Sequence, residues 1–464
     1  MQRKLGLSSL RVRGAPVALA ALIAVAGSFA ACSASTDDGD GGFEPQGPSS
    51  SSSGVGGAGA SGGTGSGGEP VLPSSNSGTG GKTPECDSDL DTDWDGDGVT
   101  DNEGDCNDCD PNVGPGAIEV IVPESGAGGA GGSGSGGSGG AAPAVDEDCD
   151  GVVDNAPLAT CDENLVYDDA DPYDAAKAIE LCQEATTKQW GIAGAAFTHA
   201  NGSPFNANSQ VGLLSDFGPN VSVQAGSRML ALSSGHARLP GHPDACGSNS
   251  CSTTPNPPPP MGYPQDVPDC PVSDVINDDM ALQLDIKAPS NATGYKFRFK
   301  FYSFEYAEYV CTTFNDQFVA LVDPPPMGAN NGNISFDGMN NPVSVNIAFF
   351  DVCDALKTDF AGNCYPDVNV VCPPQPVPYC PLGTAELMGN GFLDAFGTGN
   401  EDGGGTAWLQ TTAPVTGGEI FQIRFSIWDV GDANYDSTVL VDGFEWIAQG
   451  GTPNVGTEPI PDPK

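Results

Sequence analysis

Two acidic segments of this chain repeat one spacing of carboxylates. Residues 93–102 are DWDGDGVTDN and residues 146–155 are DEDCDGVVDN, so both follow the pattern D-x-D-x-D-G-x-x-D-N. Acids at positions 1, 3 and 5 of a tight loop direct their oxygens to one centre, position 7 offers a backbone carbonyl, and Gly at position 6 permits a positive φ. This pattern is typical of calcium-binding loops, and it predicts sites for a hard divalent cation.

The predicted ligands lie within these loops and just after the first one. The register of the first loop stays open, since Asp91 could take position 1 in place of Asp93, and Glu103 or Asp105 could fill position 12. Clustered carboxylates repel one another unless a cation lies among them, which favours metal binding over a solvated acidic linker. The predicted metal ligands are Asp93, Asp95, Asp97, Val99, Asp101, Asp105, Asp108, Asp110, Asp146, Asp148, Asp150, Val152 and Asp154.

A second group of acids lies in the C-terminal half of the chain. Glu305 and Glu308 lie within an aromatic segment at 302–310, and Asp316 follows it. The others form a D-x-x-D-x-N-x-D loop at residues 429–436. They could converge on one cation, or they could accept hydrogen bonds from loop amides, as Asp and Asn often do in turns. The second candidate site comprises Glu305, Glu308, Asp316, Asp429, Asp432 and Asp436.

No residue pattern indicates a catalytic centre. The Cys106–Cys109 pair has C-x-x-C spacing, but acids surround it, and carboxylates raise a thiol pKa rather than activate it. His199, His236 and His242 lack the spacing of a zinc site. The chain also has no G-x-S-x-G nucleophile elbow. We therefore expect a protein that is not an enzyme.

The N-terminus has the features of an export signal. A basic segment precedes an apolar run of small residues at 15–31, which predicts a signal peptide over residues 1–31. Small residues directly before Cys32 resemble a bacterial lipoprotein signal, in which Cys32 becomes lipidated; the alternative is an ordinary secretory signal. The chain has 15 cysteines, and removing Cys32 leaves an even number, which favours disulfides in an oxidising compartment.

The charge balance restricts the partners. The chain has 61 acidic and 16 basic residues and a formal net charge of −45. Such a surface repels nucleic acid and attracts cations, so we expect no nucleic-acid partner.

Composition predicts the domain boundaries. Residues 32–84 are rich in Gly and Ser and predict a flexible linker. Residues 85–155 form an Asp-rich module with a Gly/Ser insertion at 125–142, residues 156–450 are long enough for a sizeable core, and residues 451–464 form a tail. A short helix is expected after Asp171–Pro172, an N-cap followed by a first-turn Pro.

The large domain shows the alternation of β-strands. Aromatic residues at 295, 297, 299 and 301 alternate with Lys296, Arg298 and Lys300, which predicts one buried aromatic face and one solvated face. Residues 421–427 alternate in the same way. Such strands, separated by Gly, Pro and Asn, predict an all-β fold, an antiparallel β-sandwich that is jelly-roll-like with long disulfide-pinned loops at 240–273 and 353–383. Further strands are expected near residues 211–215, 228–233, 280–286, 316–322, 343–350, 406–411 and 437–447.

The acidic module resembles the MopE-like metal-binding repeats of exported bacterial proteins. The resemblance rests on DWDGDG at 93–98, DCNDCDP at 105–111, PGAIE at 115–119 and DCDGVVD at 148–154. It implies metal binding without fixing the metal, and copper is associated with the family name. Hard carboxylate oxygens and the lack of His in the module favour calcium over copper.

The large domain resembles the choice-of-anchor L family of bacterial surface proteins. The matching segments are YSFEYAEYV at 302–310, FNDQF at 314–318 and FSIWDVGDANYDS at 425–437. The resemblance implies an exported domain that different proteins attach by different anchors, here an N-terminal lipid. Phe304 stands where the family has the first of two adjacent acids, which would weaken a site that needs both.

These observations together predict a lipoprotein on the cell surface or outer membrane. Its module would bind calcium, and its sandwich would act in adhesion or in contact with the envelope, a matrix or a glycan. The alternatives are a calcium-dependent extracellular hydrolase and a copper-capture protein.

Overall fold

The computed structural model describes residues 89–120, 145–153 and 160–461, apart from 207–208, 252, 254–256, 269, 307–308, 347–381, 394–402 and 449. The chain divides into two compact units, residues 1–77 and 78–464, and every described residue belongs to the second. The predicted signal segment, Cys32, the linker and the Gly/Ser insertion lie outside the described residues, as do Asp154 and Glu308.

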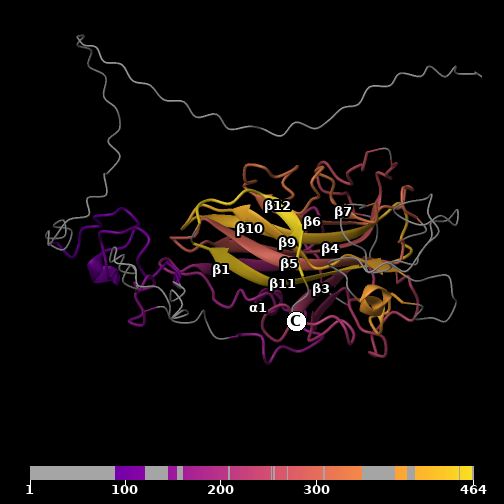
Figure 1. Ribbon diagram of the computed structural model, residues 1–464, viewed down its shortest axis with the longest axis horizontal. Helices are drawn as coiled ribbons and strands as arrows, with labels where there is room; N and C mark the ends of the chain where they lie inside the picture. The colour runs from indigo at the N-terminus through magenta and orange to yellow at the C-terminus, as the bar shows by residue number, and fades with distance from the viewer. Residues whose placement is uncertain are drawn as a thin grey trace, which may run out of the picture. The chain divides into compact units, whose positions relative to one another are not determined.

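Two antiparallel sheets form the large domain (Figure 1). The first sheet has the order β1 (Gly191–Thr198), β4 (Ile276–Lys287), β10 (Ile420–Val430), β6 (Gln317–Asp323) and β7 (Val343–Ser344). The second has the order β12 (Gly456–Pro459), β9 (Leu409–Pro414), β5 (Gly294–Ser303), β11 (Ser437–Ile447), β3 (Met229–Ser233) and β2 (Val211–Leu214), with β8 (Gly404–Gly405) also paired to β5. The described helices are α1 (Pro172–Lys177) and the short 3-10 turns η1 (Asp101–Glu103) and η2 (Gly383–Leu387).

Aromatic side chains from both sheets form the core between them. Phe297 of β5 lies edge-on to Phe425 of β10, with ring centroids 5.0 Å apart, and Phe299 lies 5.0 Å from Phe318 of β6. Because these contacts join residues of the central strands across the two layers, the core is continuous over the sandwich. The prediction of an antiparallel β-sandwich is confirmed.

The alternating pattern holds for the core face of β5, but its other face is only partly solvated. Tyr295, Phe297, Phe299 and Phe301 are all buried. Lys300, which the alternation places on the solvated face, is fully buried, and its Nζ lies 3.1 Å from an oxygen of Glu386. The prediction was wrong at this position because η2 covers the strand there and supplies the opposite charge.

Three strands lack the signals that identified the others. The sequence of β1 is GIAGAAFT, whose small residues show no clear alternation. Strand β8 has two residues, and β12 lies in the segment that was expected to be a tail, where it pairs with β9. Helix α1 begins as expected, since the Asp171 side chain accepts a hydrogen bond from the Tyr173 N–H and Pro172 occupies the first turn.

Disulfides hold several loops of the described chain. Cys246–Cys251 and Cys270–Cys311 anchor the loop region 240–273 that was expected to be pinned in this way. Cys106–Cys149 joins the two halves of the acidic module, and Cys161–Cys182 closes the segment around α1. Most of the second expected loop, 353–383, lies outside the described residues.

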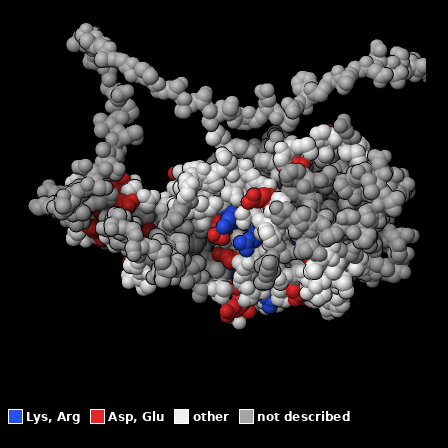
Figure 2. All heavy atoms as spheres, in the orientation of Figure 1, with Lys and Arg blue, Asp and Glu red and all other residues white. Residues whose placement is uncertain are grey.

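The described surface carries basic and acidic atoms side by side. On the face shown in Figure 2, the blue Lys and Arg atoms form small groups with red carboxylates next to them, and no extended basic patch is visible among the described residues. Ion pairs such as Lys296–Glu445, whose Nζ and Oε1 lie 3.0 Å apart, also join opposite charges on the described chain. The described residues of this face therefore form no separate cationic surface that would offset the strongly negative net charge.

A pair of acids, the partly buried Glu180 and the fully buried Asp442, joins the end of the α1 segment to β11. The N–H of Gly443 donates to Glu180 Oε2 (2.8 Å), and the N–H of Phe444 donates to the carbonyl of Ile179 (3.2 Å). Burial, and then the charge of Asp442, raises the pKa of Glu180 to about 9. Burial likewise raises the pKa of Asp442 to about 7. One proton shared between the two carboxyls therefore stabilises this contact.

We predict that this pair makes stability fall as the pH rises. The folded pKa values lie above the ordinary ones, so the folded state holds protons that the unfolded state releases. The free energy of unfolding therefore decreases between pH 3.8 and about 7 through Asp442 and between pH 4.5 and about 9 through Glu180. Glu180→Gln should reduce this slope by up to about 1.4 kcal/mol per pH unit and make the variant the more stable protein at pH 9.

Urea unfolding at fixed calcium and at several pH values measures the effect. The control is Glu163→Gln, which removes one acid at an exposed position in the same disulfide-closed segment. An unchanged pH slope in Glu180→Gln would contradict the prediction.

Candidate functional site

Five carboxylates of the first acidic loop region lie close together. Oxygens of Asp93, Asp95 and Asp108 lie within 4.8 Å of one another, and so do oxygens of Asp95, Asp97 and Asp105. Asp95 belongs to both groups and therefore lies at the centre of the cluster. The loop thus directs its first three acids as the spacing predicts, and two acids from the following segment complete the set.

Backbone amides fix these carboxylates and leave other oxygens free. One oxygen of Asp95 accepts from the Asp97 N–H, one of Asp105 accepts from the Asn107 N–H, and one of Asp108 accepts from the Trp94 N–H. The second oxygen of each of the three is buried and has no hydrogen-bond donor. Buried carboxylate oxygens without donors are unfavourable unless a cation or a proton satisfies them.

The electrostatics of the cluster agree with its geometry. Burial, with the charges of Asp97 and Asp95, raises the pKa of Asp105 to about 6. Burial, with the charges of Asp93 and Asp108, also raises the pKa of Asp95. A bound cation would reverse both effects, because it stabilises the ionised carboxylates.

The two acidic loops fold alike. Gly98 N–H donates to Asp93 Oδ2 (3.1 Å), and Gly151 N–H donates to Asp146 Oδ2 (2.9 Å) at the same position of the second loop. Gly98 and Gly151 have φ of +98° and +90°, which favours Gly at loop position 6. The same spacing of residues therefore gives the same turn twice.

The second loop gains a candidate ligand that the sequence did not predict. Oxygens of Glu119, Asp146 and Asp148 lie within 4.8 Å of one another, and Asp146 Oδ1 is buried without a donor. Glu119 ends the PGAIE segment, which carried the family resemblance but was not proposed as a ligand. Its carboxylate also accepts from the Glu147 N–H (3.1 Å), which positions it against the loop.

Several predicted ligands lie outside these groups. Asp101 begins η1, and neither it nor Asp110 belongs to a described carboxylate group. Asp150 accepts a hydrogen bond from the Val152 N–H, just as Asp97 accepts one from the Val99 N–H. In both loops the Asp at position 5 thus fixes the backbone at position 7.

The structure gathers four acids of the second candidate set at one end of the sandwich. Asp429 lies in β10 of the first sheet, and Asp316 directly precedes β6 of the same sheet. Glu305 and Asp436 come from segments adjoining the second sheet. All four are buried, with at most 4 % of each residue exposed. Asp432 is partly exposed and accepts from the Asn434 N–H.

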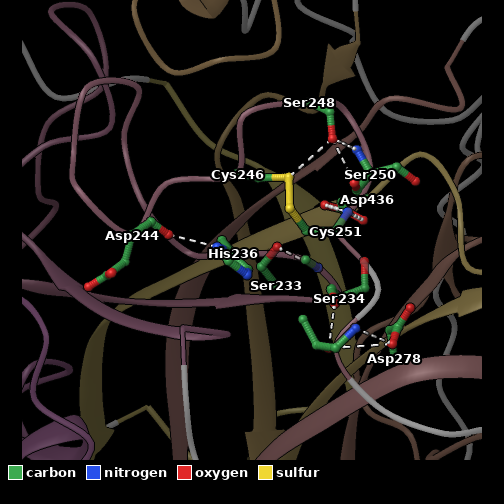
Figure 3. The surroundings of a disulfide bond; sticks show 12 residues. Ser233, Ser234, His236, Asp244, Cys246, Ser248, Ser250, Cys251, Asp278 and Asp436 are labelled. Carbon is green, nitrogen blue, oxygen red and sulfur yellow. Dashed lines mark hydrogen bonds between the residues drawn. A yellow bond between two sulfur atoms is a disulfide. The ribbon is translucent and has the colours of Figure 1, made fainter. Parts of the chain in front are cut away.

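Some of these acids do cap loop amides, which was the alternative interpretation. Asp436 accepts from the Cys251 N–H at both oxygens (3.1 and 3.0 Å), beside the Cys246–Cys251 disulfide shown in Figure 3. Asp278, which no sequence pattern predicted as a site residue, lies at a bulge of β4 with φ of +48°. Its carboxylate accepts a hydrogen bond from the Thr253 N–H. Its charge contributes to the raised pKa of Asp436, which is about 7 mainly because of burial.

One family match accompanies this architecture. Residues 171–445 match the Choice-of-anchor L domain, and this match covers more than half of the chain. The chain therefore belongs to the Choice-of-anchor L domain family, which makes it a bacterial surface protein. No curated protein and no solved structure matches the chain. Among the described residues, no helix has the length and apolar character to cross a membrane.

We predict that Asp95→Asn weakens calcium binding to the acidic module at least about tenfold, because Asp95 contributes to both carboxylate groups of the first cluster. Titration calorimetry of the full chain after chelation measures this. The control is Asp101→Asn, which changes an acid of the same loop that the structure leaves outside the cluster. Equal weakening by both changes would contradict the observed ligand set.

Proposed function

We propose that this protein is a lipid-anchored surface-display protein that binds calcium and does no chemistry of its own. Cys32 would carry the lipid, the linker would hold the folded part away from the membrane, and the acidic module would bind the ion. The sandwich would make contact with a cell surface, a matrix or a glycan. Membership of the Choice-of-anchor L domain family supports the display role.

The calcium proposal rests on buried carboxylate oxygens of the acidic module that have no hydrogen-bond donor. Asp95, Asp105 and Asp108 each have one oxygen that no donor satisfies, and these oxygens come from side chains grouped around Asp95. All ligands of this cluster are carboxylates, which suit calcium better than copper. This donor set gives no support to copper capture.

The buried acids of the sandwich do not favour a hydrolase. Glu305, Asp316 and Asp429 converge, and their pKa values are raised, as two catalytic carboxyls would require. Each is at most 1 % exposed, however, so a polymer chain could not reach them without opening the fold. Their position supports a structural role.

The display role predicts calcium-dependent binding to a surface. The full mature chain should bind immobilised glycans, matrix material or whole cells in millimolar calcium, and excess EDTA should remove most of this binding. Asp95→Asn should reduce binding, whereas Asp101→Asn should not. Binding that is equal with and without calcium would argue against a calcium-dependent role, and no binding to any of these surfaces would argue against adhesion.

The anchor is tested separately with Cys32→Ser. The unchanged chain should partition into detergent and incorporate labelled fatty acid in a bacterial host, because a lipidated cysteine retains the protein at a membrane. Cys32→Ser should remain in the aqueous phase without label. Lack of label in the unchanged chain would support an ordinary secretory signal instead.

A further inference from the structure

The buried acids of the sandwich come from both sheets at one end of the fold. Trp428 of β10 pairs with Gln317 of β6, which brings the next residue of β10, Asp429, beside Asp316. In the second sheet, Ser437 of β11 pairs with Ser303 of β5. Asp436 directly precedes β11 and Glu305 follows the end of β5 by two residues, so the strand register brings acids from both sheets to this end.

Asp316 connects the two layers. Its Oδ1 accepts a hydrogen bond from the N–H of Val430 (3.0 Å) in the first sheet, and its Oδ2 accepts one from the hydroxyl of Ser437 (2.6 Å) in the second. Because its two donors adjoin Asp429 and Asp436, this carboxylate lies between the other acids. Its charge raises the pKa of both Glu305 and Asp429, in addition to the effect of burial.

Asp429 lacks the partners that its neighbours have. It is fully buried, and neither of its oxygens has a hydrogen-bond donor in normal geometry. The nearby Ser234 hydroxyl, which donates to the carbonyl of Ser437, only partly favours the ionised form of Asp429. The Asp316 carboxyl is its other polar neighbour, and two enclosed carboxylates in contact are strongly unfavourable unless a proton or a cation lies between them.

No basic side chain compensates for this charge in the part of the chain that the structure describes. None of the ion pairs there involves Glu305, Asp316, Asp429 or Asp436. Either protons or a cation must therefore neutralise the cluster. The buried side chains present oxygen ligands only, which is the donor set of calcium and similar hard cations.

We propose that Glu305, Asp316 and Asp429 bind a divalent hard cation, of which Ca²⁺ is the best fit, between the two sheets. The three carboxylates do not form a group whose oxygens all lie within 4.8 Å of one another, so binding would draw Glu305 and Asp429 closer around Asp316. Asp436 adds negative charge beside the ion, while its own oxygens remain bonded to the Cys251 N–H (Figure 3). The ion would hold together the loops that follow β5 and β10 and precede β6 and β11. This site is independent of the acidic module and of the adhesion role proposed above.

The first test compares the full chain with Asp429→Asn, a neutral change of nearly equal shape. In EDTA the variant should melt at the same temperature as the unchanged chain or higher, because it removes an uncompensated charge. At a calcium concentration about 100 times Kd, the unchanged chain should gain about 3–5 °C more in Tm than the variant. Because both chains keep the module, calcium binding there does not affect the comparison.

The control for this test is Asp323→Asn. Asp323 lies exposed at the far end of β6, the strand that Asp316 precedes, so this change removes a charge from the same strand away from the cluster. It should show the same calcium-dependent gain in Tm as the unchanged chain. An equal calcium response in the unchanged chain and in Asp429→Asn would overturn the proposal and favour protons shared among the acids.

A second measurement does not depend on the stability of Asp429→Asn. The triple variant Asp95→Asn, Asp108→Asn, Asp148→Asn removes ligands from both module loops and leaves every sandwich acid in place. After purification in calcium and removal of free ions, elemental analysis should still find about one calcium per chain. A chain without bound metal would overturn the sandwich site. The difference in metal content between the unchanged chain and this variant reports on the module alone. The proposal of calcium in the module and the proposal of a sandwich site can therefore fail independently.

Discussion

Negative charge enclosed between the two sheets is the constraint on which the loop-bearing end of this sandwich depends. Asp316 accepts one hydrogen bond from a strand of each sheet, so a single carboxylate fixes how the layers meet there. That position places it against Asp429 and Glu305, whose charges repel its own. The loops at this end are therefore held in place only where something neutralises the acids that join them.

The acidic module meets the same constraint with a different construction. Its segments contribute few large apolar side chains, so local turns and disulfides such as Cys106–Cys149 do what a core does in the sandwich. In each loop the Asp at position 1 accepts a hydrogen bond from the N–H of the Gly at position 6, and carboxylate oxygens of the loop lie grouped together. Binding of an ion and ordering of such a segment are expected to be coupled.

These features agree with a protein that works outside the cell. The described disulfides need an oxidising compartment to form and persist. Calcium-binding modules of extracellular proteins bind at roughly 0.1–1 mM, so moderate affinity would suffice there. Membership of the Choice-of-anchor L domain family, which rests on a separate comparison, also indicates a location at the cell surface. A display domain whose loops depend on an ion would keep its binding surface ordered only in that environment.

Local patterns in the sequence determined the fold class, most strands and the turns of the acidic loops. Alternation identifies β5 and β10 because a strand between core and solvent must bury every second side chain, and the D-x-D-x-D-G spacing fixes its turn through contacts within about five residues. Strand β1 was missed because small residues give no alternation, and Lys300 was misplaced because its cover comes from distant η2.

Only the tertiary structure decided which acids meet. It added Glu119 to the second loop, left Asp101 outside the first cluster, and enclosed Asp429 with Asp316 and Glu305 between the sheets. These contacts join positions that are tens to more than a hundred residues apart, and they follow from strand register and disulfide closure. Spacing along a chain specifies the direction of side chains within one turn or strand, whereas the distance between two strands depends on how the whole core packs.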